Sequence, residues 1–149
     1  MSQTYNRKGF FPEDAHARKV RLPIAASQTL SMGDAVILSS GQVAVALAAS
    51  TSLCGVVAQD CSGLAANTPV AVWADPDTVF IGTADADSSS SLAGAEVDLV
   101  GATGAMQLDV GASTTDVFKL LSALPDDDTA SANARWQTKI NKHDFAPTR

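Results

Sequence analysis

Short runs of alternating apolar and polar residues, separated by turns that carry glycine or serine, follow one another along most of the chain. Each run has about four to seven residues, many of them β-branched, which is typical of strands with one buried face. The runs predict strands at 20–26, 35–38, 42–47, 53–59, 69–74, 78–82, 96–100, 106–110 and 135–141. Strands this short, joined by glycine-bearing connections, predict an all-β fold built as a small β-barrel or sandwich.

Two connections predict hairpins, because a glycine turn lies between two alternating runs. One is Ser39-Ser40-Gly41 and the other is the segment 101–104. Pro23 confines the run at 20–26 to an edge strand or a strand beginning, since proline has no N–H to donate. We expect the core and any subunit interface to draw on Val36, Leu38, Val43, Val45, Val56, Val70, Val72, Trp73, Phe80 and Ile81.

The segment 116–124 fits two structures. Asp116 is able to cap a helix that carries Val117, Leu120, Leu121 and Leu124 on one side. Phe118, Leu120 and the later run at 135–141 suit a terminal β-hairpin instead. We favour the strand, and both interpretations stay open at this point. The segment 85–91 has no apolar residue except Ala86 and predicts an exposed loop.

Residues 1–19 have no sustained period and are interrupted by Gly9 and Pro12, so they predict an extended or disordered N-terminal arm. The chain length suits a single β domain at 20–145, followed by a flexible C-terminal end at 146–149. Phe10 and Phe11 suit a docking element that orders when the arm binds a partner. The alternative is that both rings pack back onto the body. If they dock, the body should fold without the arm.

Charge is distributed unevenly, because no lysine or arginine occurs between Leu22 and Phe118. That stretch carries ten acidic residues, whereas residues 1–22 carry five basic and two acidic ones. An acidic body with a basic arm favours attachment to another surface. It argues against nucleic acid as the partner, because phosphate binding needs a contiguous basic face.

The sequence contains no recognisable catalytic, cofactor or metal motif. His16 falls in the predicted arm and His143 near the other end, so neither is placed as a general base in a rigid pocket. Asp75-Pro76-Asp77 and Asp85-Ala86-Asp87 lack the further ligands and the glycine of a calcium loop. We therefore expect a protein that is not an enzyme and has no cofactor.

The two cysteines, Cys54 and Cys61, are expected to be free thiols. If LCGVVAQDC is one strand, they lie on opposite faces and about 23 Å apart, too far for a disulfide. No apolar run approaches the roughly 20 residues that span a bilayer, and the start MSQTYNRKGFF has no apolar signal-peptide core. We expect no membrane partner and synthesis in a cytoplasm.

The order of the segments SMGDAVILSSGQVAVA, LCGVVAQDCSG, PVAVWADPDTVFIG and RWQTKINKHDF resembles the small capsid decoration, or cement, proteins of tailed bacteriophages. The resemblance spans 30–145 and rests on a strand entry at Gly33-Asp34-Ala35-Val36, a strand end at 55–60, the V-x-V at 70–72, and 140–145. It implies a β-tulip or small-barrel body that sits on the outside of an expanded head. It also implies homotrimers at three-fold positions and synthesis in the host bacterial cytoplasm. The longer arm and the DADSSSS insertion depart from the shorter members.

The resemblance and the charge pattern together predict a contact with the major capsid protein. We expect the arm to lie along that protein and the segment 20–24 to add a strand to one of its sheets. The predicted capsid contacts are Arg7, Lys8, Phe10, Phe11, Arg18, Lys19, Val20, Arg21 and Ile24.

A second function class is a small β module for adhesion or carbohydrate binding. Sugars stack on exposed aromatic rings, and the candidates are Tyr5, Trp73 and Trp136. Trp73 is expected to be buried because of its VAVWA setting.

Overall fold

The computed structural model describes residues 8–125 and 133–146, and over these residues the protein is all-β, as predicted. One short 3₁₀ helix, η1 (Ser90–Leu92), overlaps the end of the loop predicted at 85–91. The strands are β1 Phe11–Pro12, β2 Val20–Pro23, β3 Thr29–Leu30, β4 Ala35–Ser39, β5 Gln42–Val45, β6 Gly55–Val57, β7 Cys61–Ser62, β8 Pro69–Trp73, β9 Phe80–Thr83, β10 Glu96–Val100, β11 Gln107–Asp109, β12 Phe118–Ala123 and β13 Arg135–Ile140.

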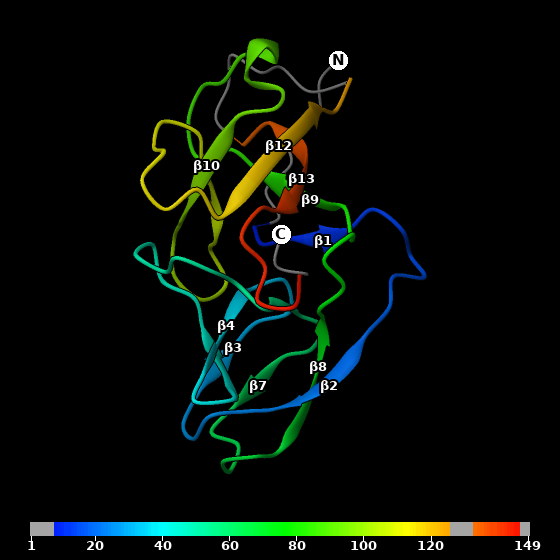
Figure 1. The fold of residues 1–149 in the computed structure, drawn as a ribbon, viewed down its shortest axis with the longest axis vertical. Helices are drawn as coiled ribbons and strands as arrows, with labels where there is room; N and C mark the ends of the chain where they lie inside the picture. Colours follow the sequence, from blue (N-terminus) through cyan, green and yellow to red (C-terminus); the bar gives the residue numbers. More distant parts are fainter. Residues whose placement is uncertain (1–7, 126–132, 147–149) are drawn as a thin grey trace.

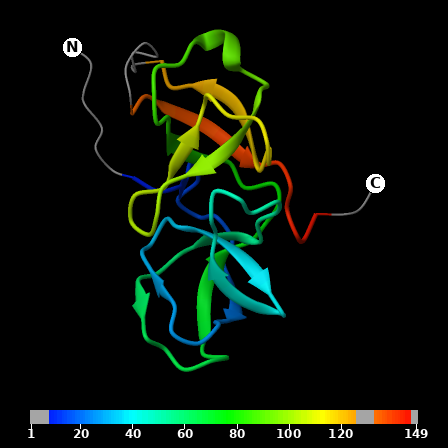
Figure 2. The ribbon, with the colours of Figure 1, turned by 90° about the vertical axis from the view of Figure 1, so that its left-hand side faces the viewer.

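The strands form two main antiparallel sheets, which lie one above the other along the long axis of the molecule (Figures 1 and 2). One sheet has the order β2-β8-β6-β4-β5, and we call residues 20–74 the first half. The other has the order β1-β9-β13-β12-β10-β11, and we call residues 80–140 the second half. Strands β3 and β7 form a separate pair.

The two halves repeat one topology. If β1 is set aside, each main sheet has five strands, which we number here by their order along the chain. In both sheets the spatial order is first, fifth, fourth, second, third. In each sheet the third strand meets the end of the first at one isolated parallel bridge, Ile24 with Val43 and Ala84 with Leu108. Each sheet therefore curls strongly and is open apart from that bridge.

The register of the strands also repeats. In each half the same strand pairings place corresponding residues opposite one another, and the hydrogen bonds of the connections correspond as well. The matching pairs are Val20–Val72 with Phe80–Thr138, Val36–Gly55 with Val97–Phe118, and Leu38–Val43 with Leu99–Leu108. Gly33 N–H donates to the Val57 carbonyl as Gly94 N–H donates to that of Leu120.

One side-chain hydrogen bond is common to both halves. Gln42 Nε2 donates to Asn67 Oδ1 at 2.9 Å, and Gln107 Nε2 donates to Asn133 Oδ1 at 2.7 Å. Both asparagines have a φ of 69°, a left-handed conformation that asparagine tolerates better than most residues. The halves are thus structural repeats of one another.

The halves share a core, although each has its own strands. One buried cluster, which includes Val36, Val43 and Val70, is confined to the first half. The other crosses between the halves and contains Val56 and Trp73 of the first half beside Phe118 of the second. Trp73 is 8% exposed, which confirms the expectation that it is buried.

The first residues that the structure describes pack onto the second half. β1 pairs with β9, and the Phe10 ring is fully buried and stacks on Phe118 with 4.4 Å between ring centroids. Gly82 makes this possible, because a Cβ at that position would lie 2.6 Å from the Phe10 ring. The alternative in which Phe10 packs back onto the body is confirmed, and the prediction of a free arm is wrong for residues 8–12. Residues 1–7 lie outside the described part of the chain.

Each predicted strand has a counterpart in the structure, and the ambiguous segment 116–124 contains strand β12, so the helical alternative is wrong. The expectation that 53–59 is one long strand was also wrong, since β6 covers only Gly55–Val57 and Cys61 belongs to β7. Strands β1, β3 and β7 were not predicted. No helix among residues 8–125 and 133–146 has the length and hydropathy needed to cross a membrane.

Candidate functional site

The nine predicted contact residues lie in different environments in the structure. Arg7 lies outside the described residues. Phe10 and Ile24 are fully buried, and Lys8 donates from Nζ to Asn133 Oδ1 of the second half. Because Phe10 and Ile24 have no exposed surface, we leave them out of the candidate site. Phe11 is half-buried in β1, and the remaining residues are Arg18, Lys19, Val20 and Arg21.

Arg18, Lys19 and Arg21 form an exposed cationic segment at the start of β2. Alternation along the strand places Arg21 on the outside, whereas Val20 and Leu22 are half-buried against the core of the first half. The Lys19 ammonium lies 5.8 Å from the centre of the Trp73 ring, a cation–π distance. Of these three residues only Arg21 lies in the first half, which has no other lysine or arginine, and Arg18 and Lys19 come directly before it.

A groove of about 440 Å³ adjoins this segment. Its walls combine apolar side chains with one cation and one carboxylate, and Phe145 in the groove is 44% exposed. The residues that line it are Arg18, Val20, Leu22, Ala74, Asp75, Pro76 and Phe145. We call the cationic segment and this groove together the β2 site. The sequence pattern did not identify Leu22 or Phe145, since only the fold brings the C-terminal segment beside β2.

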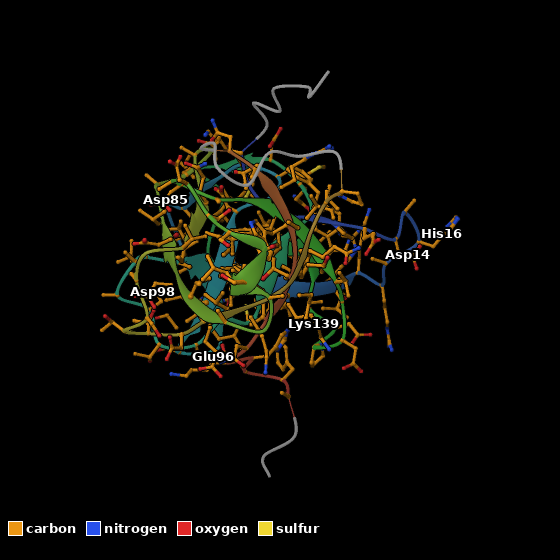
Figure 3. The ribbon with its side chains drawn as sticks, turned by 90° about the horizontal axis from the view of Figure 1, so that it is seen from above. Asp14, His16, Asp85, Glu96, Asp98 and Lys139 are labelled. Atoms are coloured by element: carbon orange, nitrogen blue, oxygen red, sulfur yellow. The ribbon has the colours of Figure 1, made fainter. Side chains whose placement is uncertain are left out.

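A second hollow, of about 410 Å³, is acidic. Glu13, Asp14, Asp75 and Asp77 line it together with His16 and Arg18. Asp14 and His16 stand on a loop that projects from one side of the molecule, far from Asp85 and Asp98 (Figure 3). Among the residues that the structure describes, no three His, Cys, Asp or Glu side chains are grouped so that they could hold a metal ion.

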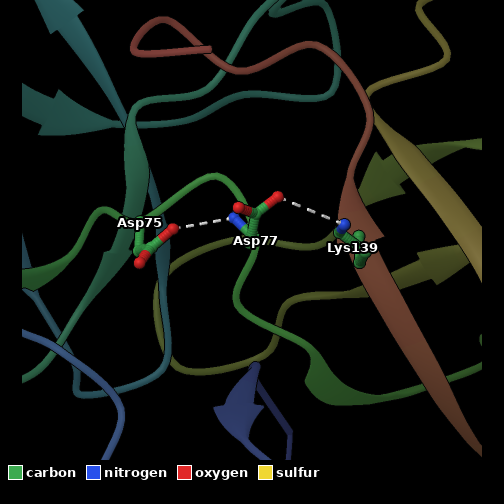
Figure 4. A network of polar contacts seen from close by, with 3 residues as sticks. All are labelled: Asp75, Asp77 and Lys139. Carbon is green, nitrogen blue, oxygen red and sulfur yellow. Dashed lines mark hydrogen bonds and ion pairs between the residues drawn. The ribbon is translucent and has the colours of Figure 1, made fainter.

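A third hollow is lined by Lys119 of β12 and Lys139 of β13 together with Asp77 and the C-terminal segment. Lys119 and Lys139 are directly opposite in the register, an unfavourable pairing of like charges. Asp77 offsets it, because its carboxylate lies 3.7 Å from Lys139 Nζ, while Asp77 N–H donates to Asp75 at 2.9 Å (Figure 4). The Asp77 side chain is 93% exposed, so this ion pair contributes little.

His143 lies where the C-terminal segment returns to the first half. It bridges to Leu53, and its Nδ1 accepts the Phe145 N–H at 3.1 Å. Its Nε2 is buried and has no partner among the described residues. Burial lowers the pKa of His143, and the nearby carboxylates of Asp144 and Asp75 oppose that effect. His143 is therefore a neutral packing residue near neutral pH.

The buried carboxylate of Asp98 organises the loop before β12. It accepts the N–H groups of Thr114, Thr115 and Asp116 at 2.9 Å. Burial by itself raises the pKa of Asp98, but these hydrogen bonds outweigh it and the pKa lies below the ordinary value. Asp98 thus has a structural role.

Both cysteines are free, as predicted. Cys54 is buried, and burial is the main cause that raises its pKa to about 12. Cys61 is half-buried, and burial also raises the pKa of its thiol. Neither thiol is in the ionised form that nucleophilic chemistry requires at neutral pH.

No protein-family model matches the chain, and no curated protein matches it either.

Proposed function

We propose that this protein is a decoration protein of a tailed-phage head. It binds the outside of the expanded head through the major capsid protein, bridges neighbouring subunits and stabilises the shell against the pressure of packaged DNA. It acts as a homotrimer at three-fold positions and does no catalysis. The observation that carries the proposal is the β2 site, in which three exposed cations and an apolar groove lie together at the edge strand of the first half, whose charged residues other than Arg21 are acidic.

The charges of the β2 site suit a surface contact. An acidic body keeps free copies apart, whereas a cationic segment at one edge is drawn to an anionic partner. The groove adds apolar area that a contact would remove from water. Repetition of such contacts over a shell turns a modest affinity per copy into firm attachment.

The experiment is co-sedimentation of the purified protein with expanded and unexpanded heads that lack it. We expect saturable binding to expanded heads, weakened by added salt because the contact is charged. A triple variant, Arg18→Gln/Lys19→Gln/Arg21→Gln, should bind much more weakly. The matched control is Lys119→Gln/Lys139→Gln, which removes exposed charge from the second half and should bind like the wild type.

Absence of wild-type binding to either form of the head would contradict the proposal. That result would favour the adhesion or carbohydrate-binding class, which glycan screening tests. That class lacks support from the two tryptophans, because Trp73 is 8% exposed and Trp136 is fully buried. Tyr5 lies outside the described residues.

Truncation is a poor test of the predicted arm. Removal of residues 1–19 would delete Phe10 from the core that the two halves share, so loss of binding would report loss of the fold. Substitutions of Arg18, Lys19 and Arg21 avoid this difficulty, since these side chains are exposed.

A further inference from the structure

The structural repeat shows how each half completes its first strand. In the second half, β9 pairs with β13 on one side and with β1 on the other. β1 places Phe11 opposite Ile81 and Pro12 opposite Phe80. In the first half, the corresponding strand β2 pairs with β8 alone along its length and ends its sheet. The matched register makes Arg21 the counterpart of Ile81.

The backbone of Arg21 faces the open side of β2. Ala71, which lies opposite Arg21, donates its N–H to Gln59 Oε1 and accepts the N–H of Ala58, so its polar groups face away from β2. In an antiparallel pair of strands, two opposite residues that form no hydrogen bonds with each other direct their backbone N–H and C=O away from the partner strand. The N–H and C=O of Arg21 therefore point outward at the sheet edge.

We propose that this edge of β2 accepts an extended acidic segment of a partner protein as an added antiparallel strand. The added strand takes the position on β2 that β1 takes on β9, and it bonds to the outward N–H and C=O of Arg21. Figure 1 shows β2 at the side of the lower half, where β8 is its labelled neighbour. The β2 groove receives an apolar side chain of the segment.

Charge favours an acidic segment of a partner protein over a second copy of this chain as the occupant of the β2 edge. Arg18, Lys19 and Arg21 surround the edge, so a second β2 strand would place like charges together, whereas an acidic segment pairs with them. The volume of the Leu22 side chain also restricts the added segment, because Leu22 lies at the position that Gly82 has in the second half. The space that Phe10 fills over Gly82 is thus occupied, and the residue opposite Leu22 must be small. The added segment therefore differs from the chain's own residues 8–12.

The inference rests on the proposed function in one respect, namely that the segment belongs to the major capsid protein. The test compares Arg21→Pro with Arg21→Gln. Proline removes the outward N–H without removing a β2–β8 hydrogen bond, whereas glutamine removes only the charge. We expect Arg21→Gln to weaken co-sedimentation with expanded heads by a few fold and Arg21→Pro to weaken it by at least about tenfold more. Thermal unfolding checks that both variants fold.

The outcomes separate the two claims. Wild-type protein that does not bind heads overturns the proposed function and this inference with it. Equal binding by Arg21→Pro and Arg21→Gln overturns the inference alone. If light scattering shows that Arg21→Pro breaks an oligomer, the occupant is a second copy and the inference is wrong.

Hydrogen exchange gives a measurement that needs no variant. The Arg21 amide should exchange quickly in the free protein and slowly on expanded heads, because an added strand accepts that N–H. Unchanged exchange at Arg21 in the bound state contradicts the inference even if both variants fail to fold.

Discussion

The two halves share a strand order and a register but differ in how the first strand of each is completed. In the second half the chain supplies the missing pieces itself, with β1 along β9 and Phe10 over Gly82. In the first half Leu22 fills the corresponding space from within β2, and the edge of β2 is left without an added strand. The same topology thus occurs once with its first strand paired on both sides and once with that strand at the edge of the sheet.

The largest expected difference between the halves comes from these two side chains. Phe10→Ala should reduce the free energy of unfolding by about 3–5 kcal/mol, because it empties a fully buried site between Gly82 and Phe118. Leu22→Ala should cost about 1–2 kcal/mol, since Leu22 is half-buried. Urea unfolding measures both. Equal losses of unfolding free energy would mean that Phe10 and Leu22 stabilise their halves equally, which would contradict the difference described above.

A smaller difference is expected at a pair of equivalent glycines. Gly33 and Gly94 both have a positive φ, at 100° and 87°. A Cβ at Gly33 would lie 2.7 Å from the Phe11 ring, whereas nothing lies within 4 Å of one at Gly94. Gly94→Ala should therefore cost about 1–2 kcal/mol from backbone strain alone.

Gly33→Ala should cost about 1–2 kcal/mol more, because the added methyl also displaces Phe11. Thermal unfolding of the two variants compares them directly. Equal shifts would show that residues 8–12 lie too loosely on the first half to resist the methyl group.

Local pattern was sufficient to predict the all-β class and most of the strands, because alternation and glycine turns act within a few residues. It predicted the β12–β13 hairpin even though 116–124 also fitted a helix, since β13 is a clear alternating run. It failed for β1, β3 and β7, which have two residues each and therefore no period. Their pairing is decided by residues far away along the chain.

The sequence led to the expectation of exposed cations before β2 but not to the packing of residues 8–12 onto the body. Exposed cations can be read from sequence, whereas the burial of Phe10 depends on Gly82, some seventy residues later. A glycine inside a predicted strand was the one available signal, because such a position often receives a side chain from elsewhere.

The repeat also escaped prediction, because few residues are identical in the two halves. The interval between equivalent positions grows from 60 residues at Ile24 and Ala84 to 66 at Asn67 and Asn133, since the loops differ in length. What the halves share is backbone geometry, which different side chains can produce.

The shared Gln–Asn hydrogen bond sharpens the comparison further. Asn133 accepts from both Gln107 and Lys8, whereas the exposed Asn67 accepts from Gln42. Glycine suits the left-handed backbone of both, so substitution tests the side chain alone. Asn133→Gly should cost about 1–2 kcal/mol and Asn67→Gly about 0.5 kcal/mol, measured by urea unfolding. A larger loss at Asn67 would contradict the expectation that the additional hydrogen bond from Lys8 makes Asn133 the more stabilising of the two asparagines.

The smallest effect is expected where the two halves meet at His143. Its pKa lies below the ordinary value of 6.5 because of burial, so the unfolded chain takes up a proton before the folded one as the pH falls. Stability should therefore decline as the pH drops below about 6.5 and should stop declining once His143 is also protonated in the folded state. The effect is small because Asp144 and Asp75 oppose the shift. As the pH is lowered from about 7 to about 5, the urea midpoint should decrease in the wild type and decrease less in His143→Gln. The glutamine is able to accept the Phe145 N–H and does not titrate. Equal slopes in the two proteins would therefore show that His143 is open to solvent. They would also show that the C-terminal segment does not bind the second half firmly to the first.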